Sequence, residues 1–339
     1  MMGKKKYGAI DIAKYVSALL VVCIHTFPFY EVSVRLNAYW IQTVCRLAVP
    51  FFFVSSGFFF FRKWDKNHPE ANQEALSRYE KRLGKIYLIW TIIYLPYTIW
   101  DYTRAGFRFY HIFAYLRNLL LNGSYYHLWF LPALMLSTWL VAKIYQRRGL
   151  KKVLSVSLIL YIIGYLINVY QPVWESIPYV SFLFSFFTKL LVTARNGIFF
   201  GPIFVGMGLL LARSHRLSHR ASLIGWAVSF VGLFLEVTIY MHFDLLRDLT
   251  SMYLMLVPAV YFMMNALLTS SIPYKESYLT LRHESLLIYT SHILFAKVFL
   301  MLWPHAHIVV YFLTLAFAQC FASLVMKYRK QFPILENLL

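Results

Sequence analysis

The stretch that decides the fold runs from Asp11 to Thr26 and reads Asp-Ile-Ala-Lys-Tyr-Val-Ser-Ala-Leu-Leu-Val-Val-Cys-Ile-His-Thr. It is apolar enough to span a membrane as a helix, yet it carries Lys14 and His25. The two residues are eleven positions apart, so at about 100° per residue they share one helix face, separated by about 16 Å along the axis. Ionisable groups in hydrocarbon need water, a partner or a ligand. The pattern predicts a polar track through a bilayer; the alternative is a snorkelling lysine and a packed histidine.

The composition indicates an integral membrane protein. Of the 339 residues, 60% are hydrophobic and 14% are charged, whereas about a quarter of the residues in a soluble domain are charged. Long apolar runs recur with no polar block of domain size between them. The first run lacks a small-residue cleavage site, so we expect a retained span and not a signal peptide. We therefore predict an all-α fold and one transmembrane domain over residues 1–339.

The net charge of +19 would suggest a nucleic-acid partner in a soluble chain. Here the Lys and Arg residues cluster in short gaps between the apolar runs, and 22 of the 33 fall in gaps that we assign to the cytoplasm. This distribution follows the positive-inside rule and predicts no nucleic-acid partner. The three cysteines have no metal or disulfide spacing and are predicted to be small core residues: Cys23, Cys45 and Cys320.

The hydrophobic runs predict a polytopic topology with both termini in the cytoplasm. Lys4, Lys5 and Lys6 place the N-terminus inside. A basic cytoplasmic loop is expected at 62–85, an amphipathic helix on the outer surface at 107–122, and a short outer turn at Asp244–Asp248. Ten spans are predicted, at about 9–30, 38–61, 86–102, 126–146, 153–171, 193–212, 221–241, 249–269, 284–303 and 307–326.

Polar residues inside these spans fall at two predicted depths and outline a path from the basic inner face to an outer vestibule. The candidates are His25, Arg46, Arg195 and Glu236 toward the outside, and Lys14, Tyr289 and His292 toward the inside.

Each candidate also has a structural explanation. The arginines could snorkel, Glu236 could pair with an arginine, and Tyr289 with His292 could form an interhelical hydrogen bond. Asp11 would pair with Lys14. His305 and His307 flank an outer turn with no Cys or carboxylate nearby, so no metal site is predicted.

The basic segment before the third span has a second possible role. Tyr79, Arg82 and Lys85 recur at helical spacing and could bind phosphate groups through charge-assisted hydrogen bonds. The alternative is ordinary anchoring to anionic lipid.

The ordered set of motifs resembles the membrane acyltransferase-3 family over essentially the whole chain. The motifs are Lys14-(ten residues)-His25, Val49-Pro-Phe-Phe-Phe-Val-Ser-Ser-Gly-Phe58, Lys81-Arg82-(two residues)-Lys85, His127-Leu-Trp-Phe-Leu131 and Ser285-Leu-Leu-Ile-Tyr-Thr-Ser-His292. Two stretches, Arg195 to Phe200 and Asp248 to Leu254, are similar to the membrane domain of vancomycin-resistance membrane-bound serine racemases.

The resemblance implies transfer of an acyl group, commonly acetyl, from cytoplasmic acyl-CoA to a hydroxyl of a cell-envelope glycan across the bacterial cytoplasmic membrane. His25 matches the family's catalytic histidine, acting as a base or a transient acyl carrier. Lys14 falls on its partner arginine, and lysine keeps the charge but lacks the bidentate guanidinium fork. Lys81, Arg82 and Lys85 match the motif that receives the phosphates of the coenzyme.

Within this hypothesis, Arg46 or Arg195 would stabilise the developing oxyanion. The rival hypothesis is a transporter or supply module for a small amino acid such as serine, whose carboxylate one of these arginines would bind. A third hypothesis is that the chain is a family member that has lost catalysis. It is motivated by Lys14, which stands where the family has an arginine. A homodimer is possible, and the acceptor and the acyl chain length stay open.

Overall fold

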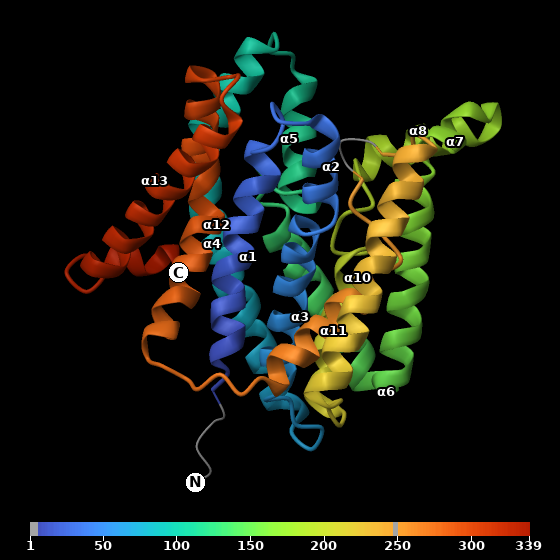
Figure 1. The fold of residues 1–339 in the computed structure, drawn as a ribbon, viewed down its shortest axis with the longest axis vertical. Helices are drawn as coiled ribbons and strands as arrows, with labels where there is room; N and C mark the ends of the chain where they lie inside the picture. The colour runs from blue at the N-terminus through green and yellow to red at the C-terminus, as the bar shows by residue number, and fades with distance from the viewer. Residues whose placement is uncertain (1–5, 247–249) are drawn as a thin grey trace. The chain divides into compact units, whose positions relative to one another are not determined.

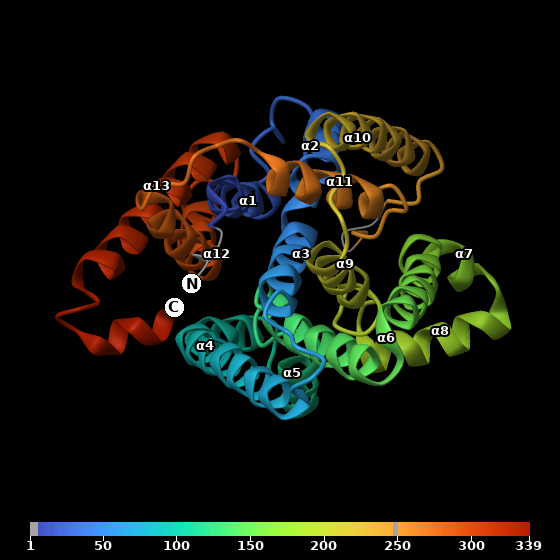
Figure 2. The same ribbon diagram turned by 90° about the horizontal axis from the view of Figure 1, so that it is seen from below.

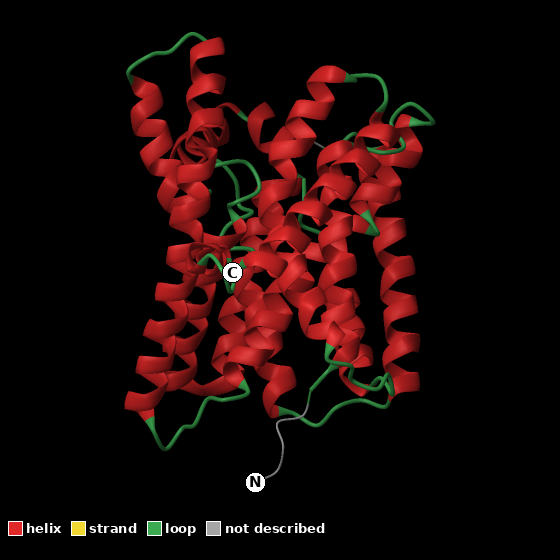
Figure 3. Cartoon of the chain, turned by 90° about the vertical axis from the view of Figure 1, so that its left-hand side faces the viewer, coloured by secondary structure: helices red, strands yellow, loops and turns green. Residues whose placement is uncertain are grey.

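The computed structural model describes residues 6–246 and 250–339, and within them it contains helices, turns and loops but no strand (Figure 3). The chain is thus an all-helical, multi-pass membrane protein, as predicted. Lys4, Lys5 and Asp248 lie outside the described residues. The chain divides into two compact units. Unit 1 comprises Met1–Ser55, Ser214–Val237 and Met255–Leu339, and unit 2 comprises Ser56–Arg213 and Thr238–Leu254.

Unit 1 is built around three helices that pack side by side, α1 (Gly8–Thr26), α12 (Ser277–Leu302) and α13 (His307–Tyr328) (Figure 1). The single helix α1 ends where Phe27 adopts a left-handed conformation with φ 52° and donates its N–H to the Cys23 carbonyl. Its apolar Ala18, Val21 and Val22 are buried. Helix α11 (Leu256–Thr269), a short 3-10 helix, η2 (Pro333–Leu338), and most of α10 (His219–His242) complete the unit.

The second predicted span is interrupted in the structure. Instead of one helix over 38–61, the chain forms α2 (Val34–Gln42), a short 3-10 turn η1 (Cys45–Leu47) and α3 (Ala48–Phe61). Ser33 caps α2 by accepting a hydrogen bond from the Leu36 N–H. The break places Arg46 on a turn that contacts α1 and α11.

Unit 2 is organised around α6 (Phe130–Val169), which packs against α4 (Pro69–Arg104) and α9 (Gly201–Arg213) (Figure 2). Gly149 breaks α6 with φ 76° and ψ −179°, a conformation that favours glycine. In place of the short polar gap predicted between spans four and five, the helix is therefore interrupted at one residue, Gly149. Helices α5 (Tyr110–Leu121), α7 (Gln171–Ser176) and α8 (Pro178–Leu191) join these elements.

The basic segment 62–85 is helical from Pro69 onward, and not the loop that the sequence suggested. Proline fits the first turn of a helix because its missing N–H would have no helical partner there. Lys81, Arg82 and Lys85 consequently lie on α4 at fixed angles to its buried face. The amphipathic helix expected at 107–122 is present as α5.

Among the residues that the structure describes, six helical segments are long and apolar enough to cross a membrane: Gly8–Thr26, Val34–Phe61, Phe130–Val169, His219–His242, Ser277–Leu302 and His307–Tyr328. Helices α8, α9 and α11 are apolar but shorter. The number of ten spans stays a prediction.

Candidate functional site

His25 and His292 face each other across the α1–α12 contact in unit 1. Their ring centroids are 5.2 Å apart with an interplanar angle of 36°. His25 lies in the last turn of α1 and is half-buried, whereas His292 is fully buried. The two histidines singled out by the sequence therefore come together, although 267 positions separate them along the chain. The prediction that they lie at two different depths is wrong, because their rings are in contact.

The backbone of α12 fixes the orientation of the His292 ring. Its Nδ1 lies 2.8 Å from the Tyr289 carbonyl and 3.1 Å from that of Ile288. Because carbonyl oxygens only accept, Nδ1 carries the hydrogen, and in the neutral ring Nε2 is then an acceptor. Tyr289 lies between His292 and Phe52, with ring centroids 6.4 Å and 6.2 Å away. These contacts fix the orientation and the tautomer of the His292 ring itself.

Lys14 occupies the other end of the same helix, as its spacing from His25 predicts, and is half-buried. Asp11 is buried, and its carboxylate lies 3.9 Å from Arg282 Nε on α12. The pairing of Asp11 thus includes an arginine that the sequence did not suggest.

Arg46 is buried on η1, and its Nε donates to Gln42 Oε1 at 2.9 Å. Gln42 ends α2 and precedes Arg46 by four positions, the spacing at which side chains on one helical face meet. A guanidinium held by a neutral amide keeps its full positive charge.

Glu236 lies on α10, and its Oε2 accepts the Met255 N–H at 2.9 Å. Met255 precedes the first residue of α11, so this carboxylate satisfies a donor at the start of that helix and interacts favourably with its dipole. The contact gives Glu236 a structural function in unit 1.

Arg195 belongs to unit 2, where its guanidinium lies 4.8 Å from the centre of the Trp129 ring. The following Asn196 caps the next turn by accepting the N–H groups of Ile198 and Phe199 at 2.9 and 3.1 Å. A Cβ atom on Gly197 would lie 2.8 Å from the Ala133 carbonyl oxygen, so only glycine fits here. The Arg-Asn-Gly motif therefore forms a tight turn packed on the start of α6.

The basic residues Lys81, Arg82 and Lys85 are exposed on α4 in unit 2. Beside them, Glu80 is half-buried, and burial raises the pKa of its carboxyl group to about 8. The sequence analysis did not single out Glu80. Its position in the sequence does indicate burial, since Glu80 follows the buried Leu76 by four residues and precedes the buried Leu83 by three, the spacing of one helix face.

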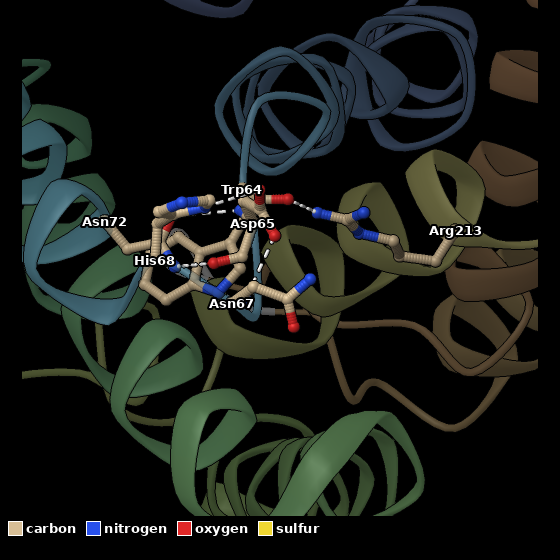
Figure 4. Close-up of polar contacts among 6 residues, drawn as sticks. All are labelled: Trp64, Asp65, Asn67, His68, Asn72 and Arg213. Atoms are coloured by element: carbon tan, nitrogen blue, oxygen red, sulfur yellow. Dashed lines mark hydrogen bonds and ion pairs between the residues drawn. The ribbon is translucent and has the colours of Figure 1, made fainter.

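A hydrogen-bonded turn precedes α4 (Figure 4). The Asp65 carboxylate accepts the Asn67 N–H at 3.0 Å and lies 2.8 Å from His68 Nδ1. Asn72 Oδ1 accepts the Asp65 N–H at 3.0 Å, and the Arg213 guanidinium donates to the carbonyls of Phe61 and Trp64. The bonds from the Asn67 N–H and from His68 lower the pKa of the Asp65 carboxyl group. Together the bonds of this turn fix the start of α4 in unit 2.

The cysteines are not all core residues. Cys23 and Cys45 are buried on α1 and η1, two elements that pack together, as predicted for small core residues. Cys320 is exposed on α13. In the part of the chain that the structure describes, no group of three His, Cys, Asp or Glu side chains is placed to hold a metal ion.

Comparison with known proteins identifies relatives for nearly the whole chain. A family model described as an acyltransferase domain matches residues 7–327. The chain is 29% identical over 269 residues to an amino-acid racemase of Enterococcus faecalis, and 30% identical over 259 residues to a serine/alanine racemase of Enterococcus gallinarum. These matches cover 79% and 76% of this chain but 37% and 36% of the relatives, so the chain spans just over a third of their length. No solved structure matches it.

Proposed function

Because the chain belongs to the acyltransferase family, we propose that it transfers an acyl group, most simply acetyl, from cytoplasmic acyl-CoA to a hydroxyl of a cell-envelope glycan. The observation that carries this proposal is the contact between His25 and His292 at 5.2 Å within unit 1. Imidazole suits proton transfer near neutral pH, and His25 lies next to a second ring whose orientation the backbone of α12 fixes.

The chemistry assigned to His25 is general base catalysis. Its imidazole accepts the proton of the acceptor hydroxyl while the oxygen attacks the thioester carbonyl carbon. A C–O bond forms, the tetrahedral intermediate collapses, the C–S bond breaks, and the coenzyme thiolate receives the proton from His25. An alternative order passes the acyl group through a nitrogen of His25 before it reaches the hydroxyl.

Arg46 is the group in unit 1 that suits the developing negative charge. It is buried, it retains its positive charge at any physiological pH, and Gln42 orients it. A preorganised cation in a low-dielectric site stabilises an oxyanion more than it stabilises the neutral carbonyl. Lys14 would keep the polar face of α1 charged, and Lys81, Arg82 and Lys85 would bind phosphates of the donor by charge-assisted hydrogen bonds.

The test is acyl transfer in vesicles with radiolabelled acetyl-CoA, comparing wild type with His25→Ala. Loss of a general base lowers the rate by about 10²–10⁴-fold. His305→Ala is the matched control, because His305 is exposed in the outer turn before α13. Turnover of His25→Ala at the wild-type rate would refute the role of His25.

The names of the relatives motivate one competing function, the handling of serine or alanine by the membrane unit. The two functions differ in what stabilises the folded protein. Ligands that bind the folded state raise its melting temperature. Acetyl-CoA should do so under the acyltransferase proposal, whereas stabilisation by serine or alanine, and none by acetyl-CoA, would favour the amino-acid function.

A further inference from the structure

The C-terminal end of α1 is held by a histidine to which the proposed function gives no role. His307 is the first residue of α13, and its side chain is 15% exposed. Its Nδ1 lies 2.7 Å from the Thr26 carbonyl oxygen. Because a carbonyl oxygen only accepts, Nδ1 carries the hydrogen and donates it. Thr26 ends α1 and directly follows His25, so this bond closes the helix beside the candidate base.

The bond completes the hydrogen bonding of the last turn of α1. Carbonyl groups at the end of a helix have no partner within the helix. The Cys23 carbonyl accepts the Phe27 N–H at 3.0 Å, and the Val22 carbonyl accepts the hydrogen of the Thr26 hydroxyl at 2.9 Å. The Thr26 carbonyl receives its hydrogen from another helix, through His307. Since helix ends fray where such bonds are missing, the order of this turn depends on α13.

The chain leaves α1 through a strained residue. Phe27 has φ 52° and ψ 54°, a left-handed conformation that is unfavourable for a bulky side chain. It also precedes Pro28, and a residue before proline prefers an extended backbone. Such strain persists only where surrounding contacts fix it, and it is common at functional sites. The His307 ring supplies contacts of this kind, with its centroid 6.3 Å from the Phe27 ring and 5.3 Å from the Tyr30 ring.

The segment that follows α1 in turn fixes His307. The His307 N–H donates to Glu31 Oε1 at 3.0 Å, and the same oxygen lies 3.8 Å from the ring Nε2. Ala306 precedes α13 and has no side chain that could cap it, so Glu31 provides an acceptor at the start of this helix. Each helix end is thus closed by a residue of the other segment. Sequence spacing alone predicts no carboxylate near His307, because Glu31 lies 276 positions earlier.

The two histidines that contact the end of α1 belong to one helical hairpin. His292 lies on α12, His307 begins α13, and residues 303–306 join the two helices. His292 contacts the His25 ring, whereas His307 holds the backbone of the next residue, Thr26. A ring contact alone leaves the helix end able to shift or turn. The additional bond to the backbone removes this freedom.

We propose that His307 is a positioning residue, which holds the last turn of α1 so that the His25 imidazole stays where it reacts. This inference rests on the proposed function, because its effect is on the step assigned to His25. His307 touches neither donor nor acceptor in this role. Its loss should therefore lower kcat and leave the KM for acetyl-CoA unchanged, since the donor phosphates are assigned to residues of α4.

Two amide substitutions test the hydrogen bond and keep a neutral polar side chain, so both variants are expected to fold. In His307→Asn the amide nitrogen stands where Nδ1 does, and kcat should stay near that of wild type. In His307→Gln the amide lies one bond further out, at the place of Nε2, and kcat should fall about tenfold or more, because a misplacement of about 1 Å can cost about 10²-fold. Melting temperatures check folding.

The matched control is His305→Gln, because His305 is exposed two positions earlier in the same turn. It should retain the wild-type kcat. Equal kcat values for the two His307 variants, an equal loss in the control, or a change in KM alone would overturn the proposal.

Hydrogen exchange in detergent tests the same bond without an activity assay. The amides of residues 22–27 should exchange faster in His307→Gln than in wild type, whereas His307→Asn and His305→Gln should exchange at the wild-type rate. Wild-type exchange in all three variants would refute the hold on α1. If wild type transfers no acetyl group but exchange follows the expected pattern, the acyltransferase function fails while the hold of His307 on the helix end stands.

Discussion

Glu80 is half-buried on α4 and lies one position before Lys81, the first of the basic residues Lys81, Arg82 and Lys85. Its pKa of about 8 lies above the value of 4.5 that an ordinary glutamate has. Between these two pH values the folded chain keeps a proton that the unfolded chain releases, so stability decreases as the pH rises through this window and levels off above it.

We therefore expect Glu80→Gln to raise the melting temperature in detergent at pH 8 and above, and to have less effect near pH 5. Melting curves of both proteins between pH 4.5 and 9 test this. Curves that stay parallel over the whole range would show that the carboxyl group is ionised in the folded protein.

Lys14 allows a second prediction at the same scale. If its charge is what matters, Lys14→Arg should keep or increase acyl transfer, because arginine retains the charge and adds a planar donor fork. Lys14→Ala should lower transfer about tenfold or more. A loss with both substitutions, at unchanged expression and melting temperature, would mean that the site is shaped around the ammonium group itself.

The helical period correctly predicted that Lys14 and His25 share one face, because α1 is a single unbroken helix from Gly8 to Thr26. It could not predict the contact of His25 with His292, which depends on how helices distant in sequence pack. Nor could the sequence predict the turn at Cys45–Leu47, since mean hydropathy identifies an apolar run but not the 3-10 turn within it.

At the scale of elements, alanine substitutions at two glycines are expected to have opposite effects on stability. A Cβ atom on Gly57 of α3 would lie 2.6 Å from the Val205 carbonyl oxygen of α9, whereas one on Gly84 of α4 would meet only the Met135 sulfur at 3.9 Å. Gly57→Ala must separate two helix backbones, and overpacking of this kind costs about 1–3 kcal/mol. Gly84→Ala should instead stabilise the protein by about 0.5–1 kcal/mol, because alanine favours a helix.

Melting temperatures of the two variants in detergent check this pair, with each variant serving as the control of the other. The contact at Gly57 would be disproved by a Gly57→Ala protein that melts at or above the wild-type temperature.

The same scale shows why the helix boundaries differ from expectation. Charged residues led us to expect a loop over 62–85, yet α4 starts at Pro69 because its buried face continues through Leu76 and Leu83. The converse holds at 193–212, where an apolar run predicted a span but Asn196 and Gly197 form a turn before α9 begins at Gly201. Local polarity alone fixes neither boundary.

For the whole molecule, the number of membrane crossings is the open prediction. Helix α6 has 40 residues, which at 1.5 Å per residue is about 60 Å, twice the hydrocarbon thickness of about 30 Å. We therefore predict that the break at Gly149 divides it into two passes. Counting α4, α9 and α11 as further passes would give the ten spans predicted from sequence, yet α9 and α11, with 13 and 14 residues, are each only about 20 Å long.

Cysteine labelling in intact cells tests this count in unit 2, starting from a Cys320→Ser background because Cys320 is exposed. If α4 and both halves of α6 cross the membrane, a membrane-impermeant maleimide should label Phe107→Cys, whereas Lys66→Cys and Lys151→Cys should react only after the cells are opened. The three positions are exposed in the structure, so differences in reactivity report sidedness and not burial. Labelling of Phe107→Cys and Lys66→Cys from the same side would mean that α4 does not cross, and the basic cluster would then need a different assignment from the cytoplasmic one.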